Sequence, residues 1–459
     1  MRARVVPVLV ALLLAPSTAS RGDEKKAAAK AGSPFGDWTT VPAVVGVDGP
    51  VDVGPDSDFA LREAVSKVGP GIEIRLASGT YALRGGNLTV FASGTAERWI
   101  AVRGPETGPP AILDFGGNGE FGIAGSYVLL EHVEVMHGGG NNVHITPRTE
   151  TIHDVIVRDC RIHALSTGPG AAIKVNRNNA ANAGVERIYL VGNDCSEAIG
   201  NALIDGVGVH QAVARGNHLH DNAKGSHGIF FKGGSSEILI EANLIRGIRG
   251  NAALQLGGNT GPDFFDPAHP DREGVDQLAR NNLIVGGDDA IFEVRGVLRG
   301  RIDHNTVVTE TGFAILRLAK GSAAGGGVST NDDIAFVNNL VLSTSGSPQY
   351  ARNDAGDVRL TFGPTLWGGT FSNSGSPGAS IPTFPRPDDV EVESTGLDDV
   401  LLDPPVSTEA RLAKIWADCA PTFYSPAIRA GGTDAGWVPV DARGRARPTT
   451  KPTFGALER

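Results

Sequence analysis

The stretch ILIEANLI at residues 238–245 is one copy of a short unit that recurs down the middle of the chain. The unit has apolar residues at alternating positions, then Asn, then one further residue and another apolar one. The other copies are VARGNHL (213–219), QLARNNLI (277–284), RIDHNTV (301–307) and IAFVNNLV (334–341), with LVGNDC (190–195) as a variant and Cys160 in place of Asn in VIVRDCRI (155–162). In register, the shared column is Cys160, Asn193, Asn217, Asn243, Asn282, Asn305 and Asn339.

A second apolar unit precedes each Asn unit, so that the two together form one repeat. Its copies are AAIKVN (171–176), ALIDGV (202–207), GIFFKG (228–233), AALQLG (252–257), AIFEVR (290–295) and AILRLA (314–319). Repeats of two to three short strands, at periods of roughly 23 to 26 residues, are typical of a solenoid of stacked parallel rungs. We expect the Asn column at a turn of each rung, because Asn tolerates the left-handed conformation and its amide can bond to the same residue one rung away.

The ends of the chain add a resemblance to this pattern. The opening PDSDFALREAVSKVGPGIEIRLASGTY (55–81), the Asn-marked repeats and the closing SPAIRAG (425–431) and VDARGRARPTTKPTFGALE (440–458) resemble bacterial right-handed parallel β-helix proteins of the pectate-lyase-like superfamily. The resemblance covers residues 41–458 and implies an all-β fold, a right-handed parallel β-helix. It says little about the reaction, because this superfamily contains lyases, hydrolases, epimerases and non-catalytic proteins.

The termini predict export and two caps. Residues 1–20 have a basic start, an apolar run and small residues for cleavage, which is typical of a secretory signal peptide. We therefore expect a secreted or periplasmic protein with a disordered leader at 21–40, a β-helix at 41–345 and a C-terminal extension at 346–459 that packs on it as an irregular cap. A further helix is expected at 408–418 in that extension.

An N-terminal helix is expected to cover the first rung, whose sheet edges would otherwise be open to aggregation. Asp56 or Ser57 can cap it, and Gly69-Pro70 would end it. The residues predicted to face the stack are Phe59, Leu61, Ala64 and Val65.

The composition of the chain limits the kinds of molecule that it can bind. The net charge of −10 and the absence of a basic tract exclude a typical nucleic-acid binder. No stretch beyond the signal approaches the roughly 18 apolar residues of a membrane span. Cys160, Cys195 and Cys419 allow one disulfide and leave one thiol unpaired. We expect a monomer whose partner is a polysaccharide.

One column of the second unit must point away from the core, because it lies between two apolar columns of each strand. It reads His144, Lys174, Asp205, Phe231, Gln255, Glu293 and Arg317. The insertions between repeats all leave the corner just after this column, and the longest is residues 258–276, which contains Phe264, Phe265, His269 and Arg272. Loops clustered on one edge of a solenoid usually mark its binding face, so we predict a polysaccharide groove here. The competing interpretation is a set of exposed cross-strand ion pairs, Lys174 with Asp205 and Glu293 with Arg317.

Lys232 interrupts an otherwise apolar inward column. Burying an unpaired lysine is costly, so we expect either a β-bulge that turns Lys232 outward or a carboxylate that holds it. Turned outward, it would be a candidate base, and His227 at the start of the same strand is a second one.

The first reaction hypothesis is β-elimination or epimerisation at a uronic acid. This chemistry needs a base for the C5 proton and positive charge beside the carboxylate. The predicted catalytic residues are Lys174, Lys232, His227 and Arg295. The predicted substrate-binding residues are His144, Arg177, Asp205, Phe231, Gln255, Glu293 and Arg317. Calcium is a further expectation, with Asp205 and Glu293 as oxygen ligands, although three rungs separate them and they cannot form one compact site.

Two alternatives remain at this stage. GGDDAIF (286–292) resembles the Gly-Asp-Asp element of polygalacturonase-like glycoside hydrolases, but the Asn-Thr-Asp and Gly-His-Gly elements are missing, and Asp288 and Asp289 align with a turn. Nothing in the sequence excludes a non-catalytic carbohydrate-binding or cell-surface β-helix, although a lyase or epimerase is the preferred interpretation.

Overall fold

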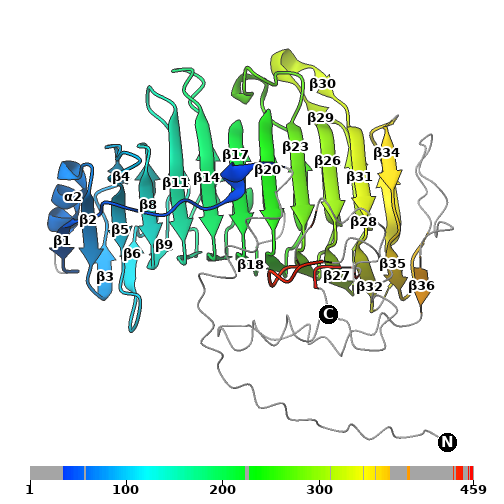
Figure 1. Ribbon diagram of the computed structural model, residues 1–459, viewed down its shortest axis with the longest axis horizontal. Helices are drawn as coiled ribbons and strands as arrows, with labels where there is room; N and C mark the ends of the chain where they lie inside the picture. The colour runs from blue at the N-terminus through cyan, green and yellow to red at the C-terminus, as the bar shows by residue number, and fades with distance from the viewer. Residues whose placement is uncertain are drawn as a thin grey trace, which may run out of the picture.

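The protein forms a long stack of parallel rungs in the computed structural model (Figure 1). The structure describes residues 35–55, 58–222, 227–310, 312–344, 346–356, 358–372 and 390–392, together with residues 438, 441–447, 453 and 455–457. Successive rungs contribute strands to three parallel sheets, which we call sheets A, B and C and which have 12, 12 and 10 strands among the described residues. The signal peptide at 1–20, most of the leader and the helix expected at 408–418 lie outside the described residues.

The strands are longest in sheet A, with up to seven residues, and shortest in sheet B, with no more than four. Sheet A contains β1 (Gly49–Val53), β2 (Ile72–Leu76), β5 (Ile100–Arg103), β8 (Val128–Glu131), β11 (Ile152–Arg158), β14 (Val185–Val191), β17 (Val209–Arg215), β20 (Ser235–Glu241), β23 (Gly274–Arg280), β26 (Val297–Asp303), β31 (Asp332–Val337) and β34 (Leu360–Phe362). Sheet B contains β3 (Gly79–Ala82), β6 (Ala111–Asp114), β9 (Val133–Met136), β12 (Arg161–His163), β15 (Asp194–Ser196), β18 (His218–His220), β21 (Leu244–Arg246), β24 (Leu283–Val285), β27 (Thr306–Thr309), β32 (Leu340–Ser343), β35 (Leu366–Gly368) and β36 (Val390–Val392). Sheet C contains β4 (Leu88–Val90), β7 (Phe121–Ile123), β10 (Val143–Ile145), β13 (Ala171–Asn176), β16 (Ala202–Val207), β19 (His227–Lys232), β22 (Leu254–Gly257), β25 (Ala290–Arg295), β28 (Ala314–Ala319) and β33 (Gln349–Asn353).

One apolar core runs through the stack. The inward residues of all three sheets form a single buried cluster from Val53 to Trp367. Since each rung is too thin to enclose a core alone, this burial depends on stacking, which is the reason that the repeat is needed for stability. The predicted all-β, right-handed parallel β-helix is confirmed.

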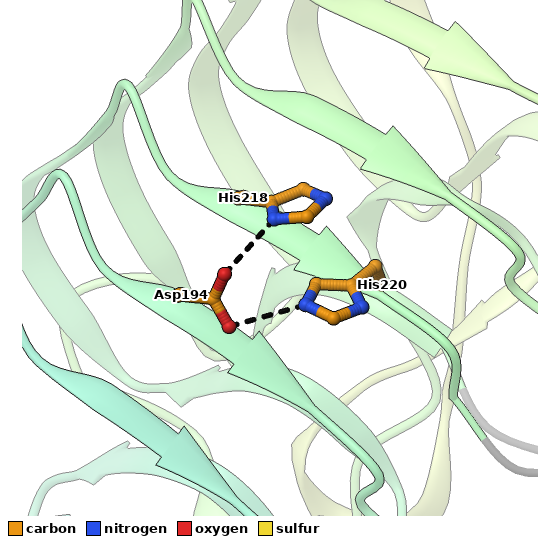
Figure 2. Close-up of side chains that lie close together, drawn as sticks. All are labelled: Asp194, His218 and His220. Atoms are coloured by element: carbon orange, nitrogen blue, oxygen red, sulfur yellow. Dashed lines mark hydrogen bonds and ion pairs between the residues drawn. The ribbon is translucent and has the colours of Figure 1, made fainter. Parts of the chain in front are cut away.

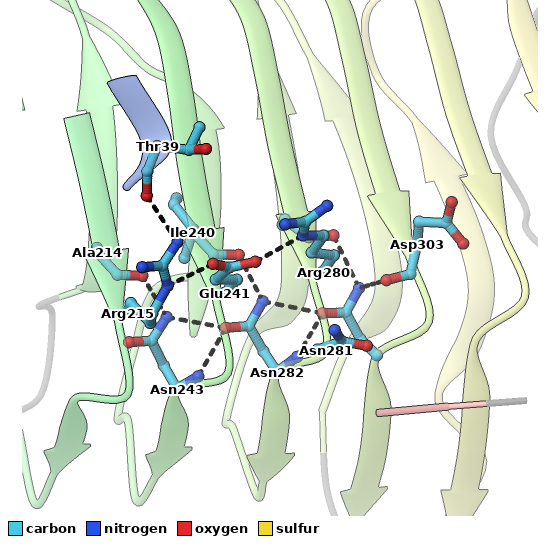
Figure 3. Close-up of polar contacts among 12 residues, drawn as sticks. Thr39, Ala214, Arg215, Ile240, Glu241, Asn243, Arg280, Asn281, Asn282 and Asp303 are labelled. Carbon is cyan, nitrogen blue, oxygen red and sulfur yellow. Dashed lines mark hydrogen bonds and ion pairs between the residues drawn. The ribbon is translucent and has the colours of Figure 1, made fainter. Parts of the chain in front are cut away.

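The Asn column forms a continuous ladder inside the corner between sheets A and B (Figure 3). Asn243 Nδ2 donates to Asn282 Oδ1 at 2.9 Å, and Asn282 Nδ2 donates to Asn305 Oδ1 at 2.9 Å. Each amide nitrogen also donates to a carbonyl of the preceding strand, as Asn282 does to Ile240 at 3.0 Å. Cys160 takes the place of Asn at the start of the ladder, where its backbone N–H donates to Asn193 Oδ1 at 3.2 Å.

The left-handed residue of this turn lies one position earlier than predicted. The positive φ belongs to Gly192, Gly216, Ala242, Asn281 and His304, which precede the ladder residues directly. The prediction that the Asn residues themselves adopt this conformation is therefore wrong. Their role is to satisfy buried backbone groups at the turn, and the residue before them makes the bend.

A charged network lies on the outer side of this corner. Glu241 on β20 accepts hydrogen bonds from Arg215 on β17 and from Arg280 on β23, the latter at 2.6 Å (Figure 3). Burial alone would raise the pKa of Glu241, but the two arginines outweigh it and hold the pKa at about 2. Arg215 also donates to Thr39 O at 2.9 Å, so the same network holds the N-terminal segment.

Short helices and irregular segments complete the molecule. Helix α2 (Asp58–Lys67) covers the first rung as predicted, with Leu61 and Val65 in the core, but Phe59 is 75% exposed and does not face the stack. Its predicted caps, Asp56 and Ser57, lie outside the described residues. The 3-10 helices are η1 (Asp37–Thr39), η2 (Pro262–Phe264) and η3 (Ala324–Gly326), and β29 (Gly321–Ser322) pairs with β30 (Val328–Ser329).

Both terminal segments contact the outside of the stack. Phe35, Trp38, Val41, Val44 and Val47 pack on the outward apolar row of sheet A, across whose strands the segment runs (Figure 1). Near the other end, Ala456 N donates to Thr306 Oγ1 at 2.9 Å. No helix among the described residues is long and apolar enough to cross a membrane. Cys160 and Cys195 are buried free thiols, and Cys419 is outside the described part.

Candidate functional site

The outward row of sheet C has the predicted register at six of its seven positions. His144 pairs with Lys174, Lys174 with Asp205, Gln255 with Glu293 and Glu293 with Arg317. Neighbouring strands of a sheet lie about 4.8 Å apart, so this row places a charged or polar side chain at nearly every step along the helix axis.

The remaining predicted residue, Phe231, is wrong by one residue. Asp205 pairs with Phe230, while Phe231 pairs with Gly206 and is fully buried in the core. The turn after β16 contains one glycine, Gly208, but the turn after β19 contains two, Gly233 and Gly234, all with positive φ. This extra residue shifts the strand relative to an ungapped alignment of the repeats.

The same shift removes the anomaly at Lys232. Lys232 pairs with Val207, two positions after Phe230, so it points outward without a β-bulge. Its Nζ lies 4.5 Å from the centre of the Phe230 ring. In the described part of the chain Lys232 has no ion-pair partner, so the expected carboxylate that would hold it is not found there.

Lys174 and Asp205 form a buried pair at the centre of the row. Lys174 Nζ lies 2.7 Å from Asp205 Oδ2, and Asp205 is completely buried, so the alternative of an exposed ion pair is wrong for these two residues. Asp205 Oδ1 accepts no hydrogen bond from any described residue. The pKa of Lys174 is lowered, because burial outweighs the attraction of Asp205, and the charge of Lys232 adds to the lowering. Lys174 therefore loses its proton more easily than an ordinary lysine.

His227 lies beside this pair and is uncharged at ordinary pH. Burial, aided by the charge of Lys232, lowers the pKa of His227 to about 4. Its Nδ1 is 3.2 Å from Asn201 O, which favours the proton on that nitrogen, and its side chain also forms a hydrogen bond with Gln255. The ring meets Phe230 edge-on, with the ring centres 5.0 Å apart.

A second charged group lies three rungs away. Glu293 Oε1 is 2.9 Å from Arg295 Nε and 3.6 Å from Arg317 NH1. Glu293 is buried, and this burial raises its pKa although both arginines act in the opposite direction. Asp289 is 3.4 Å from Arg317 and precedes β25 in a turn together with the exposed Asp288. Asp288 and Asp289 therefore lie in a turn, as their alignment indicated.

At the other end of the row, sequence reasoning missed Glu120. His144 Nδ1 is 2.7 Å from Glu120 Oε1, and His144 Nε2 is 2.6 Å from Asn176 Oδ1. The side chain of Asn141 also donates to Glu120 at 2.8 Å. Burial would raise the pKa of Glu120, but His144 and Asn141 outweigh it and lower the pKa. Glu120 precedes its strand, outside the aligned columns, so the repeat carries no signal for it.

The long insertions leave the corner after sheet C, as predicted, and two of them contact each other. Arg177 NH1 is 2.9 Å from Asp266 Oδ1, which joins the loop after β13 to the loop after β22. The side chain of Arg177 is buried in this contact. Arg177, which was predicted to bind substrate, therefore lies between the two loops and joins them. The base of the longer loop is held by Glu273, which accepts from Gly233 N at 2.8 Å and from Thr260 N at 2.7 Å.

The residues predicted to bind calcium do not fit such a site. Calcium prefers several oxygen ligands with net negative charge. Asp205 is paired with Lys174, and Glu293 is paired with Arg295 and Arg317. Neither belongs to a group of three or more potential metal ligands in the described chain. A role for calcium stays a prediction.

A separate cluster of titratable side chains lies on sheet B (Figure 2). His218 Nδ1 is 3.0 Å from Asp194 Oδ2, and His220 Nε2 is 3.1 Å from Asp194 Oδ1. Burial would raise the pKa of Asp194, but its bonds to the two histidines lower it. Burial lowers the pKa of His218, whereas Asp194 and Asp221 overcome burial and raise that of His220. Sequence reasoning missed this cluster, although HLH at 218–220 has the two-residue period that places both rings on one face of a strand.

The architecture defines the class of protein: the chain has the right-handed parallel β-helix fold of pectate-lyase-like proteins. Among solved structures it is similar to the pectate lyase Pel9A, with a TM-score of 0.52 and 16% identity over 90% of this chain and 97% of that one. It is also similar to XylC in complex with xylose, with a TM-score of 0.48, 9% identity and coverage of 89% and 98%. A rhamnogalacturonan lyase has a TM-score of 0.46, 13% identity and coverage of 80% and 99%. No protein-family model and no curated protein matches the chain. At these identities the likeness establishes the fold alone.

Proposed function

We propose that this protein is a carbohydrate-active enzyme, a polysaccharide lyase or epimerase that acts on a uronic-acid-containing polysaccharide along the outward row of sheet C. The observation that carries the proposal is Lys174, a largely buried lysine whose pKa is lowered and whose Nζ contacts a buried carboxylate. Perturbed titratable groups of this kind are typical of functional sites. The similarity to the Pel9A fold is compatible with this function.

The charges of the row suit an anionic substrate. The carboxylates of Asp205 and Glu293 are buried, whereas the side chains of Lys174 and Arg317 are 19% and 26% exposed. At Lys174 an approaching uronate therefore meets a cation before the buried Asp205, whereas Arg317 is paired with Asp289 and Asp354, which are as exposed as the arginine. Lys232, which has no ion-pair partner among the described residues, is the cation best able to neutralise a substrate carboxylate beside Lys174.

The proposed reaction begins with Lys174 in its neutral form. Its Nζ takes the proton from C5 of the uronic acid, and the electrons of the C5–H bond enter the carboxylate system, where Lys232 balances the charge. In elimination these electrons then form a C4–C5 double bond, the C4–O bond breaks, and the leaving oxygen takes a proton from solvent. In epimerisation C5 instead regains a proton on its opposite face. Asp205 stabilises the ammonium that forms on Lys174, so it favours the transition state over the ground state.

His227 competes with Lys174 for the role of base, and the pH dependence of kcat/KM separates them. A base must be deprotonated, so activity rises with pH through its pKa. With Lys174 as the base, the rise falls below the ordinary lysine pKa. With His227 as the base, the rise falls at about pH 4.

The proposal is tested by incubating the purified protein with a panel of uronic-acid and neutral polysaccharides. Elimination produces the ultraviolet absorbance of an unsaturated uronide, and epimerisation in D2O introduces deuterium at C5 without chain cleavage. New reducing ends without either signal would identify a glycoside hydrolase instead. Binding without turnover on every polymer would identify a non-catalytic carbohydrate-binding protein.

A further inference from the structure

Asp194, His218 and His220 bring three potential metal ligands together on the outside of sheet B. His218 and His220 are two positions apart on β18, so both rings project from the same face of the strand. Asp194 pairs with His218 on the neighbouring rung, β15. Figure 2 shows that each imidazole turns one nitrogen toward a different oxygen of the carboxylate.

We propose that these three residues bind a divalent transition-metal ion of the zinc type, at a site distinct from the row on sheet C. The candidate ligand atoms all lie within 4.8 Å of one another. In a tetrahedral zinc site with bonds of about 2.0–2.1 Å, ligand atoms lie about 3.3 Å apart. The two nitrogen–oxygen distances, 3.0 and 3.1 Å, are close to that separation. The two imidazoles are stacked, with ring centres 4.0 Å apart, so binding of one ion requires the rings to turn until both nitrogens point at it.

The donor set determines the class of metal. Two imidazoles and one carboxylate suit zinc, copper, nickel or iron, whereas calcium and magnesium prefer oxygen ligands alone. The histidines are mostly enclosed, with side chains 6% and 13% exposed, but Asp194 is 38% exposed. Three protein ligands beside an open face leave at least one coordination position for water or a ligand.

The surroundings of His220 resemble those of a metal ligand. Its second nitrogen, Nδ1, lies 2.7 Å from Asp221 Oδ2. Ligating histidines usually donate their other N–H to a carboxylate or carbonyl, which fixes the tautomer and strengthens the ligand. Asp221 therefore acts on the metal through His220 and is a positioning residue.

In contrast, a hydrogen bond from Arg246 to His218 disfavours metal binding. Arg246 Nε donates to His218 Nε2 at 3.3 Å, and Arg246 NH2 is 3.3 Å from Asp221. When Nδ1 binds a metal, the remaining proton of His218 moves to Nε2 and faces this N–H group. Metal binding therefore requires Arg246 to turn away from His218, so removal of Arg246 should tighten the site.

The second group of potential ligands, Glu131, His132 and Asp159, serves as an internal contrast. Glu131 already accepts from Arg103 Nε at 2.7 Å and from Arg158. His132 Nε2 and Asp159 are 3.9 Å apart, and only one imidazole is present. A carboxylate held by two arginines is a poor metal ligand, so this group should not bind.

The test is a titration of the full-length, tag-free protein with Zn²⁺ after removal of bound metal by a chelator, followed by calorimetry. Co²⁺ absorption spectra report the ligand geometry independently. We expect one equivalent of Zn²⁺ to bind, Asp194→Asn and His220→Gln to weaken binding at least 100-fold, and Asp221→Asn to weaken it about 10- to 100-fold. Arg246→Met should strengthen binding, and His132→Gln should not change it.

Circular dichroism of each variant distinguishes loss of the site from loss of the fold. The proposal is overturned if the wild type binds no Zn²⁺, or if folded Asp194→Asn and His220→Gln bind it as tightly as the wild type does. Because sheet B carries none of the proposed catalytic residues, either result leaves the uronate hypothesis untouched.

Discussion

The Asn ladder and the outward row of sheet C are both polar columns that follow the helix axis. They differ in how completely their buried polar atoms are hydrogen-bonded. In the ladder, Asn282 Oδ1 accepts from Asn243 N and Nδ2, and its Nδ2 donates to Ile240 O and Asn305 Oδ1. In the sheet C row, Asp205 is fully buried but has one ion-pair partner, and its Oδ1 accepts no hydrogen bond from a described residue.

This difference in hydrogen bonding distinguishes a column that stabilises the fold from a column that is a candidate functional site. A buried polar group that completes all its hydrogen bonds contributes to the fold, whereas one that lacks them costs free energy and calls for another explanation. The ladder is thus the structural polar column. The outward row of sheet C contains buried charged groups without a full set of hydrogen-bond partners, and such groups are typical of sites that act on a substrate.

The largest expected effect on stability comes from breaking the ladder. Asn282→Ala leaves Asn243 N without its acceptor and Ile240 O without the Asn282 amide donor, and it removes one partner of Asn243 Nδ2. We therefore expect a loss on the order of 3 kcal/mol in the free energy of unfolding. Gln255→Ala, the matched change in the sheet C row, should cost about 1 kcal/mol, since the Gln255 amide donates chiefly to Gly257 O. Urea unfolding measures both. Equal losses would mean that the Asn ladder contributes no more to stability than the sheet C row does.

A similar loss is expected from Glu241→Gln. The change leaves the buried Arg280 without its carboxylate, which costs about 3 kcal/mol at neutral pH. The folded pKa of about 2 is below that of an unfolded glutamate, so wild-type Glu241 stabilises the fold above about pH 4.5 and loses this contribution as the pH falls toward 2. The difference between variant and wild type should therefore shrink with acidification. A difference that is independent of pH would contradict the assignment.

Asp205→Asn is expected to change the pH profile of activity more than it changes stability. Asp205 raises the pKa of Lys174 against the effect of burial, so its removal lowers that pKa further. The rise of kcat/KM with pH should move to lower pH, and kcat should fall because the ammonium loses its counter-charge. Rate measurements across pH provide the test. An unchanged profile would show that Lys174 does not control it.

The smallest effect concerns the turn before the ladder. Ala242 has a φ of 54°, while Gly192 and Gly216 occupy the same position in earlier rungs. Ala242→Gly should therefore stabilise the protein by about 0.5–1 kcal/mol. Ala279→Gly, in a strand, should destabilise it by a similar amount. Destabilisation by both changes would show that the left-handed turn imposes no strain at Ala242.

The sequence predicted the fold because each rung repeats the same burial problem. The Asn column, the outward row and the corner of the insertions all follow from that repetition. Phe231 was misplaced because Gly233-Gly234 adds a residue that equal spacing between repeats conceals. Contacts between distant segments had no sequence signal: Arg177 meets Asp266 across two loops, and His144 meets Glu120 outside the aligned columns. The sheet B cluster depends on which side chains meet on neighbouring rungs, which only the register of the strands reveals.

The role of Lys174 as the base is tested by the activity of Lys174→Arg on the polysaccharide that the wild type turns over. Arginine keeps the positive charge beside Asp205 and therefore the ion pair, but it cannot be deprotonated and cannot act as a base. We predict a fold and stability close to those of the wild type, with kcat reduced on the order of 10²- to 10⁴-fold, while the exposed control Lys67→Arg keeps full activity. Lys174→Arg with wild-type kcat would show that the sheet C row does not perform the reaction through Lys174.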